Sequence, residues 1–303
     1  KISQQLANYK INNYLSEDLI SSFNAFIDYA RFGYLHFRVY FKINYLSDEK
    51  FKGLIQTLLW HQSIVELNEC GGKYDLIAVF ASLNPSEFNK RFKELISKNP
   101  AQLKNYSILT TVVNHYYPRS YLAPVQKDTV SLFREEVSDI ILGGDRSILA
   151  IHKREKHLLR ELQENARIPT LSLAKKIKVD QKTARVMISR LQEASIIKAY
   201  RPLFNVQIIG FIVNKILLKY HNFSVEKEQE LLTFCKFNPH VVELIKVFGE
   251  WDVELTVETK TREEFQRVYI SIREKFEDII QDFESFPIFK TYRKAFLPMS
   301  MFI

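Results

Sequence analysis

The sequence predicts an α+β protein in which two sandwich domains of βαββαβ order flank a smaller helical domain. Two observations support this fold class. The chain of 303 residues repeats itself at an offset of 177 positions, and its excess of positive charge lies in one window between the two copies. Because that window differs from the copies in both periodicity and charge, we expect separate folding units.

The repeat is clearest at two glycine turns. The stretches GGKYDLIAV and FGEWDVELTV share a glycine, an aromatic residue and an aspartate in the same order. Gly72 and Asp75 of the first stretch lie 177 positions before Gly249 and Asp252 of the second. A fixed offset that continues without a gap predicts that both copies have the same fold.

Hydrophobic spacing predicts the elements of each copy. In the first copy, alternation from Phe37 to Ile43 predicts a strand with one buried face, and the spacing from Phe51 to Leu59 predicts an amphipathic helix. The rest of this copy is expected to form strands at 64–70 and 74–82, a helix that begins after Asn84, and a strand at 108–117. The second copy is expected to form strands at 211–220, 241–248, 251–259 and 284–293, with helices at 224–237 and 262–280.

This order predicts two ferredoxin-like sandwiches, each with helices on one side of a four-stranded sheet. The other sheet face would be apolar and uncovered, so we expect another copy of the same face to bury it. Two arrangements remain open: the faces meet within one chain, or between two chains. We favour a homodimer or a higher homo-oligomer through these faces.

Residues 145–205 have a different pattern. They contain 14 Lys and Arg against 6 Asp and Glu, whereas the rest of the chain is balanced. Leucines at 158–162 indicate a first helix, residues 171–177 a second, and residues 181–193 a third that follows the turn at Lys178 to Asp180. The run SIIKAYRPLFN then predicts a β-wing. Three helices and a wing with this charge predict a winged helix-turn-helix that binds double-stranded DNA.

The third helix is expected to enter the major groove, where amide and guanidinium groups read base edges and lysines reach phosphates. A solvated helical spacer is the alternative. The candidate DNA-binding residues are Gln181, Lys182, Thr183, Arg185, Ser189, Arg190, Lys198 and Arg201.

The stretch from Asn165 to Asn205 resembles the DNA-binding domain of the Lrp/AsnC family of transcription regulators. The matching features are Asn165-Ala-Arg-Ile, Leu173-Ala-Lys-Lys, Lys182-Thr, and Ile188-Ser-Arg-Leu followed by Ile196-Ile-Lys-Ala-Tyr. The resemblance implies that the βαββαβ domain dimerises and responds to a small effector such as an amino acid. Lys178 and Ser195 stand where this family often has glycine, so we expect those turns to have different shapes.

In that family a Gly-x-x-Asp signature lies beside the effector. The resemblance therefore implies an effector site at Gly72, Asp75, Gly249 and Asp252. The structural alternative is that each aspartate only caps backbone N–H groups of its hairpin.

The offset also accounts for the N-terminal residues, because 1–33 align with 178–210. The expected domains are a remnant of a first winged helix-turn-helix at 1–32, a first effector domain at 33–122, a linker at 123–144 with a helix over 130–142, the winged helix-turn-helix at 145–205, and a second effector domain at 206–303.

No motif of a nucleotide-binding loop, a serine hydrolase or a zinc protease is present, and no apolar run is long enough for a membrane helix. We therefore predict a cytoplasmic, non-enzymatic transcription regulator without a cofactor or metal. The alternative is a sirohaem (tetrapyrrole) decarboxylase, an activity known among Lrp-like proteins. His115 and Arg119 are the candidates for an anion or acid/base pair, and a strand-end histidine beside a solvated arginine is the favoured explanation.

Overall fold

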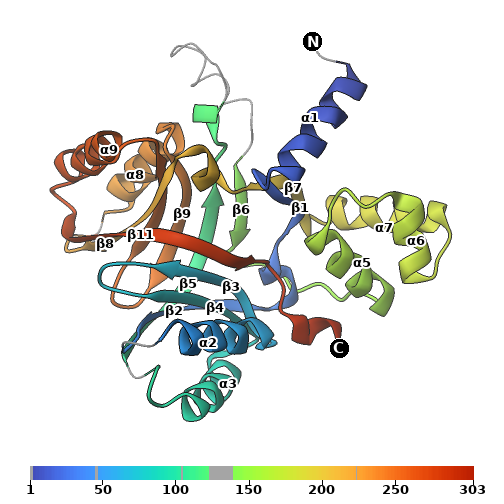
Figure 1. Cartoon of the computed structure of the whole chain (residues 1–303), viewed down its shortest axis with the longest axis horizontal. Helices are drawn as coiled ribbons and strands as arrows, with labels where there is room; N and C mark the ends of the chain where they lie inside the picture. The colour runs from blue at the N-terminus through green and yellow to red at the C-terminus, as the bar shows by residue number, and fades with distance from the viewer. Residues whose placement is uncertain (1–2, 45–46, 104, 123–138, 223) are drawn as a thin grey trace.

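The structure is a computed structural model that describes residues 3–44, 47–103, 105–122, 139–222 and 224–303. Its centre is a nine-stranded antiparallel sheet in the order β2-β4-β3-β11-β8-β10-β9-β5-β6, and a further pairing of β2 with β5 closes it into a barrel. Figure 1 shows α2 and α3 on one outer side of this barrel, α8 and α9 on another, and the winged domain at one end.

The first half of the barrel follows the predicted order of elements. These are β2 (Leu35–Lys42), α2 (Asp48–Trp60), β3 (Ile64–Cys70), β4 (Leu76–Ser82), α3 (Pro85–Lys98) and β5 (Asn105–Tyr116). Asn84 caps α3 by accepting a hydrogen bond from the Glu87 N–H at 2.8 Å. Phe88, Phe92 and Leu95 of α3 are buried against the sheet, as the 3.6-residue spacing predicts.

The second half repeats the first. Its elements are β8 (Ile212–Tyr220), α8 (Val225–Phe237), β9 (Val241–Phe248), β10 (Val253–Thr259), α9 (Arg262–Lys275) and β11 (Ile280–Lys294). Helices α2, α3 and strand β4 begin and end 177 residues before α8, α9 and β10. The helix expected at 262–280 ends at Lys275, because residues 276–279 form turns that lead to the start of β11 at Ile280.

The two halves do not form separate sandwiches, which corrects that part of the predicted fold class. Each half has a long last strand that pairs with both halves. β5 pairs with β2 through residues 105–110 and with β9 through 110–116, and β11 pairs with β8 through 280–288 and with β3 through 288–294. The sheet faces therefore meet inside one chain, and the expected dimer through these faces is replaced by closure within the chain.

A two-stranded ribbon connects the barrel to the helical parts. β1 (Ile20–Ile27) pairs antiparallel with β7 (Ile197–Phe204), and the 3-10 turns η1 (Tyr29–Phe32) and η3 (Val206–Ile209) lead from these strands into the barrel. Helix α1 (Gln4–Ser16) precedes β1 and projects away from the body in Figure 1. None of its residues is buried, and Tyr9 is 64% exposed.

The winged domain consists of α5 (Lys153–Glu164), α6 (Thr170–Ile177), α7 (Gln181–Glu193) and β7. Its core is continuous with the barrel end through Leu158, Leu162 and Phe296. The Gln163 side chain fixes this contact: it accepts from the Phe296 and Leu297 N–H groups at 3.0 and 2.7 Å and donates to the Leu297 carbonyl at 3.2 Å. The C-terminal turn η4 (Met299–Phe302) packs beside α5.

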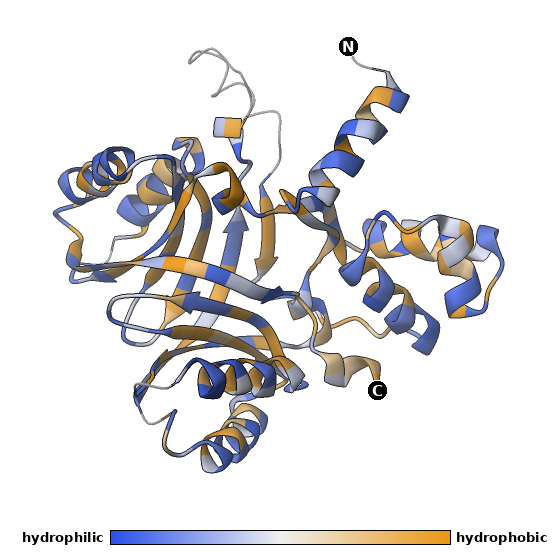
Figure 2. Cartoon of the chain, viewed as in Figure 1, coloured by the Kyte–Doolittle hydropathy of each residue, from blue (hydrophilic) through white to orange (hydrophobic). Residues whose placement is uncertain are grey.

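The expected helix at 130–142 lies largely outside the described residues, and its C-terminal end is wrong. Residues 140–143 form β6 (Ile140–Gly143), which pairs with β5. A short 3-10 turn, η2 (Ser120–Leu122), follows β5. Figure 2 shows hydrophobic residues concentrated in the strands and hydrophilic residues along the outer helices. Across the described parts of the chain, we find no helix with the length and hydropathy of a membrane span.

Candidate nucleic-acid interface

Helix α7 is positioned by a short turn after α6. Lys178 ends α6 in a left-handed conformation with φ of 56°, and Asp180 caps α7 by accepting from the Thr183 N–H at 2.8 Å. The predicted bounds of this helix, 181–193, are confirmed. Ala184 and Leu191 of α7 are buried in the domain core, so the opposite face of the helix is directed to solvent.

The outward face of α7 carries half of the predicted DNA-binding residues. Gln181, Lys182, Arg185 and Ser189 are all exposed. Within the described chain, no side-chain hydrogen bond or ion pair engages any of the four. An exposed polar and basic helix face without internal partners is available for an external polyanion.

The other predicted DNA-binding residues have partners or less exposure. The Thr183 hydroxyl bonds to Asp180 at 2.6 Å as part of the cap, and Arg190 pairs with the buried Glu155 carboxylate at 2.9 Å. Lys198 is only partly exposed, and Arg201 lines a cavity between the β1–β7 ribbon and the barrel. Thr183 and Arg190 are thus exposed but engaged within the domain, and Lys198 and Arg201 are less exposed than the four outward residues of α7.

Helix α1 is the counterpart of α7 at the 177-residue offset. Its exposed face carries amides in place of the basic residues of α7. Asn8 accepts a hydrogen bond from Arg167 of the winged domain at 3.1 Å, and Arg167 also lies over the Phe23 ring. The first copy thus contacts the second through a polar link between the N-terminal half of α1 and the winged domain.

The two glycine turns lie at the end of the barrel opposite the ribbon. The Asp75 carboxylate accepts from the Ile43 N–H at 2.7 Å and from Lys42 at 3.1 Å. Asp252 repeats this with the Tyr220 N–H at 2.8 Å and Lys219 at 3.3 Å. Each aspartate therefore holds the end of a neighbouring strand, β2 or β8, and not, as the structural alternative had it, N–H groups of its own hairpin.

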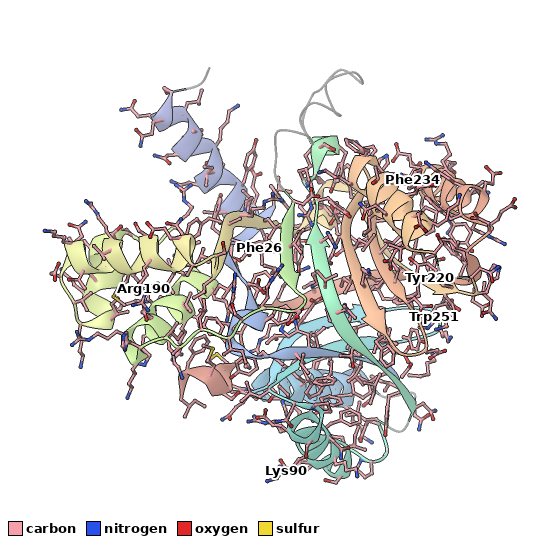
Figure 3. All side chains as sticks on the ribbon, turned by 180° about the vertical axis from the view of Figure 1, so that it is seen from behind. Phe26, Lys90, Arg190, Tyr220, Phe234 and Trp251 are labelled. Carbon is pink, nitrogen blue, oxygen red and sulfur yellow. The ribbon has the colours of Figure 1, made fainter. Side chains whose placement is uncertain are left out.

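The glycines of these turns have positive φ, 78° at Gly72 and 147° at Gly249. The two turns are also adjacent, because Lys73 of one lies 3.6 Å from Glu250 of the other. Figure 3 shows Arg190 in the winged domain and Trp251 on the far side of the barrel, so the candidate DNA-binding face and the second turn are well separated.

The barrel interior contains an ion network that the sequence did not reveal. Arg38 donates twice to the Glu254 carboxylate at 2.8 Å, and Lys215 reaches the same carboxylate at 2.5 Å. Glu243 joins through Lys215 at 3.5 Å, and Tyr40 also donates to Glu254. Although burial opposes its charge, Arg38 and Lys215 hold the pKa of Glu254 below its ordinary value.

The structure does not bring His115 and Arg119 together as an acid/base pair. Arg119 donates twice to Glu258 at 2.7 Å, and Tyr121 bonds to the same carboxylate. Burial lowers the pKa of His115, whose charged neighbours are Asp139, Lys246 and Glu228. Among the described residues, no group of three or more His, Cys, Asp or Glu side chains is arranged to hold a metal ion.

The fold and this exposed helix face define a winged-helix DNA-binding protein, and comparisons with known proteins agree. Residues 151–198 match the family described as winged helix-turn-helix DNA-binding. An uncharacterized HTH-type transcriptional regulator of Pyrococcus horikoshii is 32% identical over 122 residues, which cover 40% of this chain and 81% of that protein. The HTH-type transcriptional regulator FL11 of Pyrococcus furiosus is 26% identical over 111 residues, 36% of this chain and 72% of that protein.

The chain belongs to the Lrp/AsnC family of DNA-binding transcription regulators. Over almost its whole length, the chain is also similar in fold to a solved siroheme decarboxylase structure. The siroheme decarboxylase NirDL has a TM-score of 0.64 with 11% identity, over 99% of this chain and 86% of that one. At that identity the likeness concerns the fold alone.

Proposed function

We propose that this chain is a sequence-specific transcription regulator that reads the major groove with α7. The observation that carries the proposal is the outward face of α7, where Gln181, Lys182, Arg185 and Ser189 are exposed and without internal partners. A helix of 13 residues is about 20 Å long, and its width fits a major groove of about 12 Å.

The residue types on this face suggest distinct roles. The Arg185 guanidinium matches the two acceptors of guanine, and the Gln181 amide matches the donor and acceptor of adenine. Lys182 is suited to a phosphate contact, which adds affinity without sequence information. Arg190 already neutralises Glu155, so we assign it a structural role in the domain.

The test is duplex binding by a double variant. A duplex selected from a random pool is titrated against the wild type and Lys182→Ala/Arg185→Ala, with fluorescence anisotropy as the readout. Loss of one base contact and one phosphate contact is expected to weaken binding by about a hundredfold. Lys260→Ala/Arg267→Ala removes two exposed charges near and on α9 and is expected to bind as the wild type does. Equal binding by the α7 variant would exclude this helix as the reader.

The domain plan remains a proposal: a segment equivalent to the recognition helix and wing at 1–32, effector domains at 33–122 and 206–303, a linker at 123–144 whose last residues form β6, and the reading domain at 145–205. We infer that the two halves of one chain are arranged as two subunits are in a dimer. The supporting observation is the antiparallel pairing of β1 with β7, strands at equivalent positions of the repeat. Further self-association would use surfaces other than the closed sheet faces.

An effector response at Gly72, Asp75, Gly249 and Asp252 is a separate proposal. It is supported by the adjacency of the two turns and by the partial exposure of both aspartates. An amino acid would offer its ammonium group to a carboxylate there. The test adds each of the twenty amino acids singly and measures duplex affinity. At least one should change the affinity of the wild type. Asp252→Asn should abolish that change and leave the affinity without amino acid as it is in the wild type.

A tetrapyrrole decarboxylase is the second candidate, favoured by the cavity between the β1–β7 ribbon and the barrel, whose basic side chains outnumber its acidic ones. Incubation with sirohaem should shift the absorption band of the tetrapyrrole if this candidate is correct. An unchanged spectrum together with duplex binding would leave the regulator as the function.

A further inference from the structure

A cavity of about 440 Å³ lies where the β1–β7 ribbon meets the barrel. Its walls come from β1, β7 and η3, from β3, β5, β8, β9 and β10, and from the last residues of β11. The volume lies within the range of small-molecule sites in proteins. None of the four residues of the proposed effector site lines this cavity, so the two sites are distinct.

The basic side chains of the cavity outnumber its acidic ones by six to four. Three of the six have partners: Arg119 with Glu258 at 2.7 Å, Lys215 with Glu254 at 2.5 Å, and Lys294 with Glu243 at 3.3 Å. The other three are Arg201, Lys290 and Arg293.

These three have no carboxylate within 4 Å among the described residues. Arg293 donates to the Ile64 carbonyl at 3.1 Å, and Lys290 lies over the Tyr292 ring. Burial and the nearby Arg119 lower the pKa of Arg201, and burial lowers the pKa of Arg293. Lys290 is exposed, whereas Arg201 and Arg293 are partly buried without a carboxylate partner, an arrangement that is costly unless an anion joins them.

Comparison of the two copies shows that this charge is not required by the fold. Arg201 lies opposite Asn24 in the ribbon, and Asn24 is also its counterpart at the 177-residue offset. By the same offset, Arg293 corresponds to Tyr116. The first copy thus builds the same strands with neutral side chains, so the arginines serve something other than strand formation.

We propose that this cavity binds a small anion through carboxylate or phosphoryl groups, held by Arg201 and Arg293. The planar guanidinium group donates two parallel hydrogen bonds to such a group, and Lys290 adds a third charge. Arg201 belongs to the strand that leaves the winged domain, and Arg293 belongs to the barrel. An anion between them would link the two parts.

The experiment uses the full chain and three probes: inorganic phosphate, citrate, and uroporphyrin as a tetrapyrrole polycarboxylate. Calorimetry is expected to show binding of at least one probe to the wild type. Binding to Arg201→Gln/Arg293→Gln should be at least about tenfold weaker, because a charge-assisted hydrogen bond is lost at each position. Arg262→Gln/Arg267→Gln removes two exposed arginines of α9 and should bind as the wild type does.

Circular dichroism verifies that the cavity variant is folded, and Arg201→Gln alone replaces it if it is not. Binding of phosphate or citrate would identify a small anion, and binding of uroporphyrin alone would identify a tetrapyrrole. Binding of none of the three, or equal binding to the cavity variant, would overturn the proposal. Lys182→Ala/Arg185→Ala should retain anion binding, so failure of this site and failure of the DNA-binding proposal are distinguishable.

Discussion

Lys178 and Ser195 adopt left-handed backbone conformations, with φ of 56° and 53°. The expectation that these turns differ in shape because they lack glycine is wrong: the side chains are accommodated in the conformation that glycine favours. Asp18 has φ of 57° and corresponds to Ser195 at the repeat offset, so both copies keep this turn. Such a conformation costs a non-glycine residue roughly 1 kcal/mol.

Replacement of either residue by glycine should therefore stabilise the protein. We expect Lys178→Gly and Ser195→Gly each to raise the free energy of unfolding by about 0.5–1 kcal/mol through relief of backbone strain. The greater freedom of glycine in the unfolded chain offsets part of this gain. Urea denaturation measures this. Lys175→Gly, within α6, is the control and should lower stability by about 1 kcal/mol. Destabilisation by all three variants would contradict the account of the turns.

His36 is buried, stacked on Tyr29 and bonded through Nε2 to the Phe296 carbonyl at 3.1 Å. Burial lowers its pKa from 6.5 to about 3, with Arg38 contributing in the same direction. Between these pH values the unfolded chain binds the proton and the folded chain does not. The contribution of His36 to stability is therefore fully present above pH ~6.5 and falls as the pH drops, by up to about 1.4 kcal/mol per pH unit.

His36→Gln keeps a donor for the carbonyl but does not titrate. We expect its stability to depend less steeply on pH than that of the wild type between pH 6.5 and 5, where most carboxylates remain ionised. Burial also lowers the pKa values of His61 and His115. Both histidines are present in the variant and in the wild type, so a difference between the two slopes of stability against pH belongs to His36. Identical slopes would mean that His36 is protonated in the folded protein.

At the scale of elements, the repeat offset predicted much of the structure. Helix α7 has the predicted bounds, and α1 and β1 match α7 and β7 in length and position. Hydrophobic spacing suffices for helices because each one buries a single face. Strand β6 was missed because its four residues obtain their partner from β5, which is distant in sequence.

The Gln163 side chain makes the polar contacts that attach the winged domain to the barrel end, beside the apolar packing there. Gln163→Ala would leave three buried backbone groups, at Phe296 and Leu297, without their partner. We expect a loss of roughly 2–4 kcal/mol in the free energy of unfolding. Gln192→Ala, on the exposed face of α7, should change stability by less than about 0.5 kcal/mol. Calorimetry of both variants tests this, and a neutral Gln163→Ala would show that apolar packing alone holds the domain.

For the whole molecule, the sequence predicted two equivalent halves but left open where their sheet faces meet. Strands β5 and β11 each pair with both halves, and this exchange closes the barrel within one chain. Local periodicity cannot show such an exchange, because alternation defines the buried face of a strand and not its partner. The ion network escaped prediction for a related reason: Arg38 and Glu254 lie 216 positions apart and meet only in the closed barrel.

The cavity beneath the ribbon also depends on the closed barrel. Its walls combine residues from both copies, and the sequence placed Arg201 on a DNA-contacting wing. Charge composition correctly located the basic module but could not distinguish arginines that face solvent from those that face an interior space. The candidate site was therefore predictable where a single helix presents it and not where several strands converge.

The salt dependence of duplex binding tests the central claim, that α7 contacts DNA phosphates and bases, most directly. The logarithm of the association constant should fall linearly with the logarithm of salt concentration, by about 0.9 for each phosphate neutralised. Lys182→Ala should reduce this slope by roughly 1, whereas Lys260→Ala should leave it unchanged. A wild-type affinity that does not vary with salt, or a slope that Lys182→Ala does not alter, would contradict the claim.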